Sequence, residues 1–273
     1  MKRLIVLAAL ICCALVPSKA RAAEKPKRPN FLFIYTDDQR WDAMGVVQRE
    51  HGEHARFPWF KTPNMDRLAS EGVRFRNAFV TMSLCAPSRA AFLTGRYNHC
   101  NGVSNNGTPF PEDNVTYASL LGDAGYVTGY FGKWHMDGQE DRPGFDTWAS
   151  FVGQGKYFNC PVIVDDDEVL TTGWVDDVTT DYALEFLDEN QAESFAMVVG
   201  YKSAHGPFDP PERAAERFAG KEARKTPNFD TPAIYKAEGV AEAKRETNLG
   251  YFRCLSAIDE NLGRLLDALD HLK

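Results

Sequence analysis

Four short segments of this chain share one pattern, a run of apolar residues that leads into a cluster of polar ones. The runs are Phe31–Tyr35, Val73–Val80, Tyr126–Phe131 and Phe195–Tyr201. Phe31–Tyr35 has no strongly polar position, which is typical of a central parallel strand that is buried on both faces. We therefore predict four strands whose ends each present polar side chains.

Helical patterns lie between these runs. A helix is predicted from Thr62-Pro63 to Gly72, because Pro suits a first helical turn and Gly favours a C-terminal stop. Three more are predicted after the capping residue Thr116, over residues 176–190, and over residues 255–269, where leucines recur at three- and four-residue spacing. Residues 161–174 are predicted to form a hairpin with a solvated acidic turn at 165–168.

Alternating strands and helices indicate an α/β fold with a largely parallel sheet sandwiched by helices. Ligands of such sheets bind beyond the carboxyl ends of the strands. All four polar clusters fall at such ends, so we expect them to share one site.

The composition is that of a soluble globular protein, with 44% hydrophobic and 25% charged residues among 273. This length allows one large α/β domain or two small ones. The net charge of -7 argues against a general nucleic-acid binder, and we expect no nucleic-acid partner. It leaves room for a local cationic pocket that binds an anionic substrate.

The N-terminus has the features of a secretory signal. Met1-Lys2-Arg3 is basic, Leu4–Val16 is apolar but short for a membrane span, and Ala20-Arg21-Ala22 gives a small-x-small cleavage pattern. We expect residues 1–22 to be a removed signal peptide and the mature protein to be secreted or periplasmic. The alternative is a short membrane anchor, but we expect no stable one.

Three cysteines have no assigned chemistry. Cys100, Cys160 and Cys254 are an odd number, so they allow at most one intrachain disulfide, and the sequence does not say which pair would form it. The simpler expectation for each is a buried free thiol.

Asp37 and Asp38 are adjacent carboxylates at the end of the first predicted strand. Such a pair is electrostatically costly unless a cation lies beside it, and oxygen ligands suit calcium or magnesium. The alternative is a solvated turn or a helix cap. His51 and His54 form a second candidate metal pair, but we expect them on a loop near the substrate entrance.

Cys85 opens the run Cys-Ala-Pro-Ser-Arg-Ala-Ala-Phe-Leu-Thr-Gly-Arg. Pro87 is compatible with a helix that starts here, which would direct free N–H groups and the positive end of the helix dipole toward an anionic substrate. Cys85 could be a buried structural thiol, or a thiolate nucleophile with His135 or His205 as its base.

The twelve-residue run favours a third reading, because it resembles the signature of the type I formylglycine-dependent sulfatases, members of the alkaline-phosphatase-like superfamily. Four other stretches resemble motifs of that family in the same order: 37–39 (Asp-Asp-Gln), 132–135 (Gly-Lys-Trp-His), 142–146 (Arg-Pro-Gly-Phe-Asp) and 204–207 (Ala-His-Gly-Pro).

The resemblance implies that a formylglycine-generating enzyme converts Cys85 to formylglycine. One hydroxyl of its hydrate would attack sulfur, and the second would expel sulfate and regenerate the aldehyde. Asp37, Asp38 and the modified Cys85 would bind Ca²⁺, with Mg²⁺ as the alternative.

The same resemblance implies roles for four further residues. Arg89 would contact the formylglycine or its metal, and Lys133 would bind sulfate oxygens. His135 would act as the base in the elimination, and His205 would bind sulfate and protonate the leaving alcohol.

We therefore expect a sulfuric ester hydrolase that acts on an aryl or, with preference, a carbohydrate sulfate. The alternatives are a phosphodiesterase or phosphonate hydrolase on the same scaffold, and an inactive protein that binds sulfated glycans. Residues 23–273 are expected to be an incomplete catalytic domain, the N-terminal part of a longer enzyme, because the family's later metal-binding strand and lysine do not follow.

Overall fold

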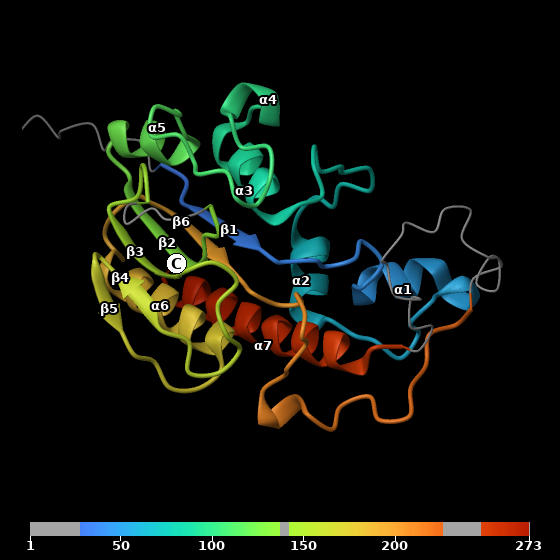
Figure 1. Cartoon of the computed structure of the whole chain (residues 1–273). Coiled ribbons are helices and arrows are strands. Elements are labelled where there is room, and N and C mark those ends of the chain that lie inside the picture. The colour runs from blue at the N-terminus through green and yellow to red at the C-terminus, as the bar shows by residue number, and fades with distance from the viewer. Residues whose placement is uncertain (1–27, 137–141, 226–246, 273) are drawn as a thin grey trace, which may run out of the picture.

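The structure of the protein, a computed structural model, describes residues 28–136, 142–225 and 247–272. The predicted signal peptide, residues 1–22, lies outside the described residues. In the described part, a six-stranded sheet is covered by helices on both faces (Figure 1). This confirms the predicted α/β class.

The sheet is parallel for most of its width. Its strands are β1 (Phe31–Tyr35), β2 (Val127–Lys133), β3 (Thr147–Phe151), β4 (Val162–Val164), β5 (Asp167–Val169) and β6 (Phe195–Gly200). They lie in the order β1-β6-β2-β3-β4-β5. The first three pairings are parallel, and the pairings of β4 with β3 and β5 are antiparallel.

Seven α-helices surround the sheet in the described residues. They are α1 (Gly45–His51), α2 (Pro63–Glu71), α3 (Cys85–Thr94), α4 (Asn98–Asn101), α5 (Tyr117–Asp123), α6 (Val175–Glu189) and α7 (Leu249–His271). The predicted helices α2, α5, α6 and α7 are confirmed. Thr116 caps α5 through a reciprocal pair of bonds with Ser119. Asn248 caps α7, which begins at Leu249, six residues before the predicted start.

Side chains of the sheet alternate between two apolar clusters. Met197 and Val199 of β6 pack with residues of α6 and α7, whereas Val198 faces the cluster that contains residues of α3 and α5. Figure 1 shows α6 and α7 on one side of the sheet and α3 and α5 on the other. The period-two alternation of a strand thus lets one central strand bury both of its faces.

One predicted strand is absent, and another lies at a different place in the sheet than predicted. Val73–Val80 is irregular, and its apolar side chains are exposed, with Phe79 at 90%. A strand needs a partner for its N–H and C=O groups, and none of the described strands lies beside this segment. Phe31–Tyr35 does form β1, but β1 is the outer strand of the described sheet and is only half-buried, not central.

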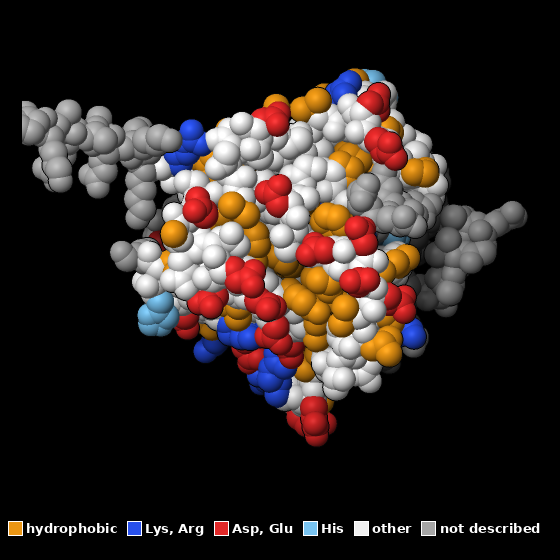
Figure 2. Space-filling view, turned by 90° about the vertical axis from the view of Figure 1, so that its left-hand side faces the viewer, with side chains coloured by type: hydrophobic (Ala, Val, Ile, Leu, Met, Phe, Trp, Pro, Cys, Tyr) orange, Lys and Arg blue, Asp and Glu red, His pale blue; other side chains and the backbone are white. Residues whose placement is uncertain are grey.

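The acidic hairpin is present but shorter than predicted. β4 and β5 are joined by a tight turn at Asp165 and Asp166, both with positive φ, and residues 165–168 are exposed. The face of the molecule that carries this hairpin is rich in Asp and Glu (Figure 2). Solvation of the turn is confirmed.

Cys100, Cys160 and Cys254 are all free thiols in the structure. Cys160 and Cys254 are buried, as expected of structural thiols, whereas Cys100 is exposed. None of the helices within the described ranges is long and apolar enough to cross a membrane.

Candidate active site

Residues from three separate parts of the chain line one pocket at the carboxyl end of the sheet. Asp37 and Asp38 follow β1, His205 follows β6, and Cys85 and Arg89 belong to the first turns of α3. The pocket has a volume of about 500 Å³. The tertiary structure therefore brings these five predicted site residues together.

Cys85 is the first residue of α3, and Pro87 lies in the first turn, as predicted. Its Sγ lies 3.6 Å from Asp37 Oδ1 and 3.8 Å from Lys133 Nζ. Burial, reinforced by Asp37, raises the pKa of the thiol, so the thiol is protonated at neutral pH. None of the contacts described for Cys85 is with a histidine, although His205 lines the same pocket.

Asp37 is a buried carboxylate, 5% exposed, between two cations. It accepts a hydrogen bond from Arg89 Nη2 at 3.3 Å and forms an ion pair with the Lys133 ammonium. Burial alone would raise the pKa of Asp37, but the positive charges of Arg89 and Lys133 outweigh it and lower the pKa. Asp37 is therefore ionised.

Arg89 is fixed by contacts on three sides. Arg89 lies one turn after Cys85 on α3. Its Nη1 donates hydrogen bonds to the Lys133 carbonyl at 2.5 Å and to the Tyr130 hydroxyl at 3.3 Å. Its guanidinium carbon lies 4.9 Å from the centre of the Tyr35 ring. A guanidinium held in this way presents a fixed positive charge at the wall of the pocket.

Lys133 is fully buried and has a partner that the sequence analysis missed. Its Nζ donates to the Gln154 amide oxygen at 2.5 Å, and the Gln154 carbonyl accepts a hydrogen bond from Lys202 Nζ at 2.9 Å. Burial and the charge of Lys133 lower the pKa of Lys202. The Gly153-Gln154-Gly155 sequence after β3 and the polar cluster after β6 were the available signals for these two residues.

The two predicted histidines occupy different places. His205 lines the pocket, with Nδ1 2.9 Å from the Gly206 carbonyl oxygen and Nε2 4.0 Å from Asp38 Oδ2. His135 does not line it. Burial and the nearby charges of Lys133 and Arg89 lower the pKa of His135 to about 4, so this ring is neutral at pH 7.

Asp176, in the first turn of α6, is a third residue that the sequence analysis missed. Its buried carboxylate accepts hydrogen bonds from the backbone N–H groups of Lys202, at 2.7 Å, and Ser203, at 3.1 Å. Burial raises its pKa to about 6. These bonds hold the segment that leads from β6 to His205.

The carboxylate oxygens of Asp37 and Asp38 are the type of ligand that a hard cation prefers, but two carboxylates do not complete its coordination. Both supply carboxylate oxygens, and the Asp38 side chain is 60% exposed to the pocket and solvent. Ca²⁺ takes about six to eight oxygens, whereas the described residues contain no group of three or more His, Cys, Asp or Glu arranged for a metal. His51 and His54 are exposed, but they are not on a loop as predicted: His51 ends α1 and His54 ends the 3-10 turn that follows it. The His51 ring packs 5.7 Å from that of Trp41.

The chain is similar to known sulfatases over nearly all of its length. The sequence profile of the Sulfatase family matches residues 29–273. The N-acetylglucosamine-6-O-sulfatase of Bacteroides thetaiotaomicron is 37% identical over 194 residues, which cover 70% of this chain and 33% of that protein. The Ulvan-active sulfatase of Formosa agariphila is 29% identical over 286 residues, 98% of this chain and 52% of that protein.

Solved structures of sulfatases are also similar to this chain. BT4656 in complex with its substrate D-glucosamine-2-N,6-O-disulfate has a TM-score of 0.79 at 27% identity, covering 90% of this chain and 63% of that one. The putative sulfatase YidJ from Bacteroides fragilis has a TM-score of 0.75 at 26% identity, covering 93% and 61%. These neighbours have the alkaline-phosphatase-like fold that the sequence resemblance implied.

The chain spans about a third of the length of the Bacteroides thetaiotaomicron sulfatase and about half of that of the Formosa agariphila sulfatase. Sulfatases of this kind generally depend on formylglycine and a divalent metal. With the family profile matching residues 29–273, and the motif residues gathered at one end of the sheet, the chain belongs to the sulfatase family.

Proposed function

We propose that this protein hydrolyses a sulfate ester of a carbohydrate and releases inorganic sulfate, using formylglycine made from Cys85. The observation that carries the proposal is the buried cationic cluster beside Cys85. Lys133 Nζ lies 3.8 Å from the Cys85 Sγ, and Arg89 lies behind it. A site with fixed positive charge next to the reacting atom favours a substrate whose reacting group is an anion.

Lys133 and Arg89 have different electrostatic roles in this proposal. Lys133 is the nearer to Cys85, so its ammonium binds sulfate oxygens and stabilises the charge that moves onto them as the ester bond breaks. Arg89 holds Lys133 through its carbonyl and Asp37 through its carboxylate. Arg89 therefore fixes the distance between the charge that binds sulfate and the carboxylate beside it.

The two histidines suit opposite proton transfers. The neutral His135 can accept a proton at pH 7, because its pKa is about 4. His205 lines the pocket, with its Nε2 4.0 Å from Asp38 Oδ2. His205 is therefore placed to give a proton to the leaving alcohol, and His135 to accept one from the hydroxyl that releases sulfate.

Asp37 and Asp38 would hold Ca²⁺, with Mg²⁺ as the alternative, together with the modified Cys85. A bound divalent cation would lower the pKa of the attacking hydroxyl and neutralise charge on the sulfate. Asp37 already contacts Lys133 and Arg89, so cation binding competes with the Lys133 ammonium for its carboxylate.

The names and ligands of the relatives support the proposed substrate class. One is named for the 6-O-sulfate of N-acetylglucosamine, and a structural neighbour was solved with a sulfated glucosamine as its substrate. We propose a sulfated amino sugar as the substrate of this protein as well. We also propose that the protein is exported after removal of residues 1–22, because export would bring it to glycans outside the cytoplasm.

The decisive experiment combines mass spectrometry with matched substrates. The protein is coexpressed with a formylglycine-generating enzyme and tested on N-acetylglucosamine 6-sulfate and 6-phosphate, with and without Ca²⁺. We expect an aldehyde at position 85 and Ca²⁺-dependent sulfate release, with the phosphate a poor substrate. Cys85→Ala should abolish turnover, whereas Cys100→Ala, an exposed cysteine outside the pocket, should not.

Two outcomes contradict the proposal. Sulfate release that persists in Cys85→Ala would exclude the formylglycine mechanism, and preference for the phosphate ester would favour the phosphohydrolase alternative. Export is tested separately, because N-terminal sequencing of the mature protein should begin at Ala23.

A further inference from the structure

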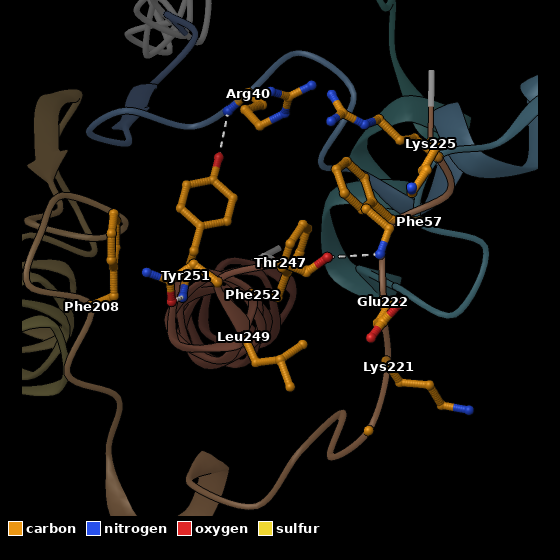
Figure 3. Close-up of a pocket in the computed structure, with 14 residues that line it drawn as sticks. Arg40, Phe57, Phe208, Lys221, Glu222, Lys225, Thr247, Leu249, Tyr251 and Phe252 are labelled. Atoms are coloured by element: carbon orange, nitrogen blue, oxygen red, sulfur yellow. Dashed lines mark hydrogen bonds between the residues drawn. The ribbon is translucent and has the colours of Figure 1, made fainter. Parts of the chain in front are cut away.

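The segment of residues 202–208 carries His205 into the candidate active site and is anchored at both of its ends. At its start, the Asp176 carboxylate accepts hydrogen bonds from two backbone N–H groups of the segment. At its other end, the Phe208 ring packs edge to face against Tyr251 of α7, with ring centroids 5.7 Å apart (Figure 3). His205 lies between these two anchors, where its position depends on contacts of its own backbone.

Tyr157 supplies such a contact from another part of the chain. Its hydroxyl donates a hydrogen bond to the His205 carbonyl oxygen at 2.5 Å. Tyr157 lies between β3 and β4 in the sequence and is 4% exposed. It is not one of the described residues that line the active-site pocket. The mechanism proposed above gives it no role, and it can act on the reaction only through a residue that does line the pocket.

Tyr157 is itself held firmly. Its ring stacks on Trp174, with ring centroids 6.2 Å apart and an angle of 11° between the planes. Its carbonyl accepts a hydrogen bond from the Val175 N–H at 2.7 Å, and Lys202 Nζ lies 4.8 Å from the centre of its ring. Burial raises the pKa of the Tyr157 phenol, so the hydroxyl stays protonated at neutral pH and remains a donor.

The His205 carbonyl is coupled to the His205 imidazole through the next residue. This carbonyl and the Gly206 nitrogen belong to one planar peptide group, so the Tyr157 hydroxyl fixes the orientation of that group. The imidazole Nδ1 lies 2.9 Å from the Gly206 carbonyl oxygen, and it is the donor because a carbonyl only accepts. Nε2 then lies on the side of Asp38, at 4.0 Å from Oδ2. Because glycine rotates freely about its backbone bonds, the Gly206 carbonyl can turn away from the ring once the Tyr157 contact is lost.

We propose that Tyr157 is a positioning residue for His205, and that its hydroxyl holds the peptide whose neighbouring carbonyl orients the imidazole. The inference rests on the proposed function, in which His205 protonates the leaving alcohol. In that step the bond between sulfur and the ester oxygen breaks, its electron pair goes to the oxygen, and the oxygen takes the proton from Nε2. The ring is left neutral, with its remaining proton on Nδ1. Loss of the Tyr157 hydroxyl should therefore impair substrates whose leaving group needs that proton.

Two sulfate esters with different leaving groups test this role. The para-nitrophenyl ester releases a stable phenolate that leaves without a proton, whereas N-acetylglucosamine 6-sulfate releases a sugar alcohol that needs one. With protein matured as above, Tyr157→Phe should raise the ratio of kcat/KM for the aryl sulfate to kcat/KM for the sugar sulfate about tenfold. A misplaced acid loses part of the about hundredfold or larger contribution of general acid catalysis.

Tyr201→Phe is the matched control, because Tyr201 is also buried and its hydroxyl bonds with Thr180 rather than with the His205 carbonyl. Its ratio should equal that of the wild type. In the His205→Ala background, Tyr157→Phe should change the ratio no further, since Tyr157 acts through His205. An unchanged ratio in Tyr157→Phe, or an equal further change in the absence of the histidine, would overturn the inference. Thermal unfolding of each variant confirms that it is folded.

A spectroscopic measurement needs no turnover. Long-range proton–nitrogen correlation spectra of histidine-labelled protein show which nitrogen of the neutral His205 ring carries the proton, with His205→Gln as the assignment control. We expect the proton on Nδ1 in the wild type and on both nitrogens in a mixture in Tyr157→Phe. If sulfate is released but the ratio and the tautomer are the same in Tyr157→Phe, the function stands and the positioning role is wrong. If no sulfate is released but the tautomer depends on Tyr157, the positioning contact stands and the hydrolase is wrong.

Discussion

The Gln154 amide oxygen accepts a hydrogen bond from the Lys133 ammonium at 2.5 Å. Asp37 contacts the same ammonium, so the buried Lys133 side chain is held by a carboxylate and an amide together. Through its carbonyl, Gln154 also holds Lys202. One loop residue thus positions two lysines at the site.

Gln154→Ala should lower kcat about tenfold and change KM little. Without the amide, Lys133 keeps its ion pair with Asp37 but loses the contact that fixes its ammonium toward the sulfate, so the transition state is affected more than substrate binding. Steady-state kinetics on N-acetylglucosamine 6-sulfate measures both parameters. Gln191→Ala, an exposed glutamine bonded to Asp188, is the control. A rise in KM alone would contradict the positioning role.

Asp37 and Asp38 should differ sharply in their contribution to stability. In metal-free protein, Asp37→Ala leaves Arg89 and Lys133 buried without their carboxylate, at a cost of about 3–5 kcal/mol. Asp38→Ala should cost less than about 1 kcal/mol, because its side chain is 60% exposed. Urea unfolding in EDTA measures both. Equal losses would show that Asp37 does not neutralise the buried cations.

The depressed pKa of His135 predicts a pH dependence of stability. The ordinary pKa of 6.5 falls to about 4 in the folded state, so the unfolded chain binds the proton more readily between these values. The stability contributed by neutral His135 is complete above pH 6.5 and is lost as pH falls toward 4. His135→Gln should flatten the unfolding free energy over this range. The exposed His99→Gln should not, and parallel curves for all three proteins would refute the assignment.

Asp176→Ala should destabilise the protein by about 2–4 kcal/mol, because the N–H groups of Lys202 and Ser203 lose their buried acceptor. Asp176→Asn keeps one acceptor oxygen and should lose less. Asp181→Ala, which removes an exposed ion pair with Arg264, should cost less than about 1 kcal/mol. Urea unfolding ranks the three, and a loss in Asp176→Ala no larger than that in Asp181→Ala would contradict the role of Asp176.

Local signals in the sequence predicted the helices well and the strands less well. Pro63 and Gly72 bound α2, and Thr116 caps α5, because capping depends on residues a few positions apart. Val73–Val80 has the apolar content of a strand but forms none, and β3 was missed. A strand is stabilised by a neighbour that can come from anywhere in the chain, so its own residues do not decide it.

The site divides in the same way. The sequence alone predicted Asp37, Cys85, Lys133 and His205 as site residues, because each belongs to a motif that resembles one of the sulfatase family. Only the tertiary structure decided that Lys133 lies against Asp37 and Gln154, and that Asp176 holds the segment before His205. These contacts join residues that are 21 to 96 positions apart. The order of the strands in the sheet brings such residues together, and that order depends on packing between distant segments that no local pattern encodes.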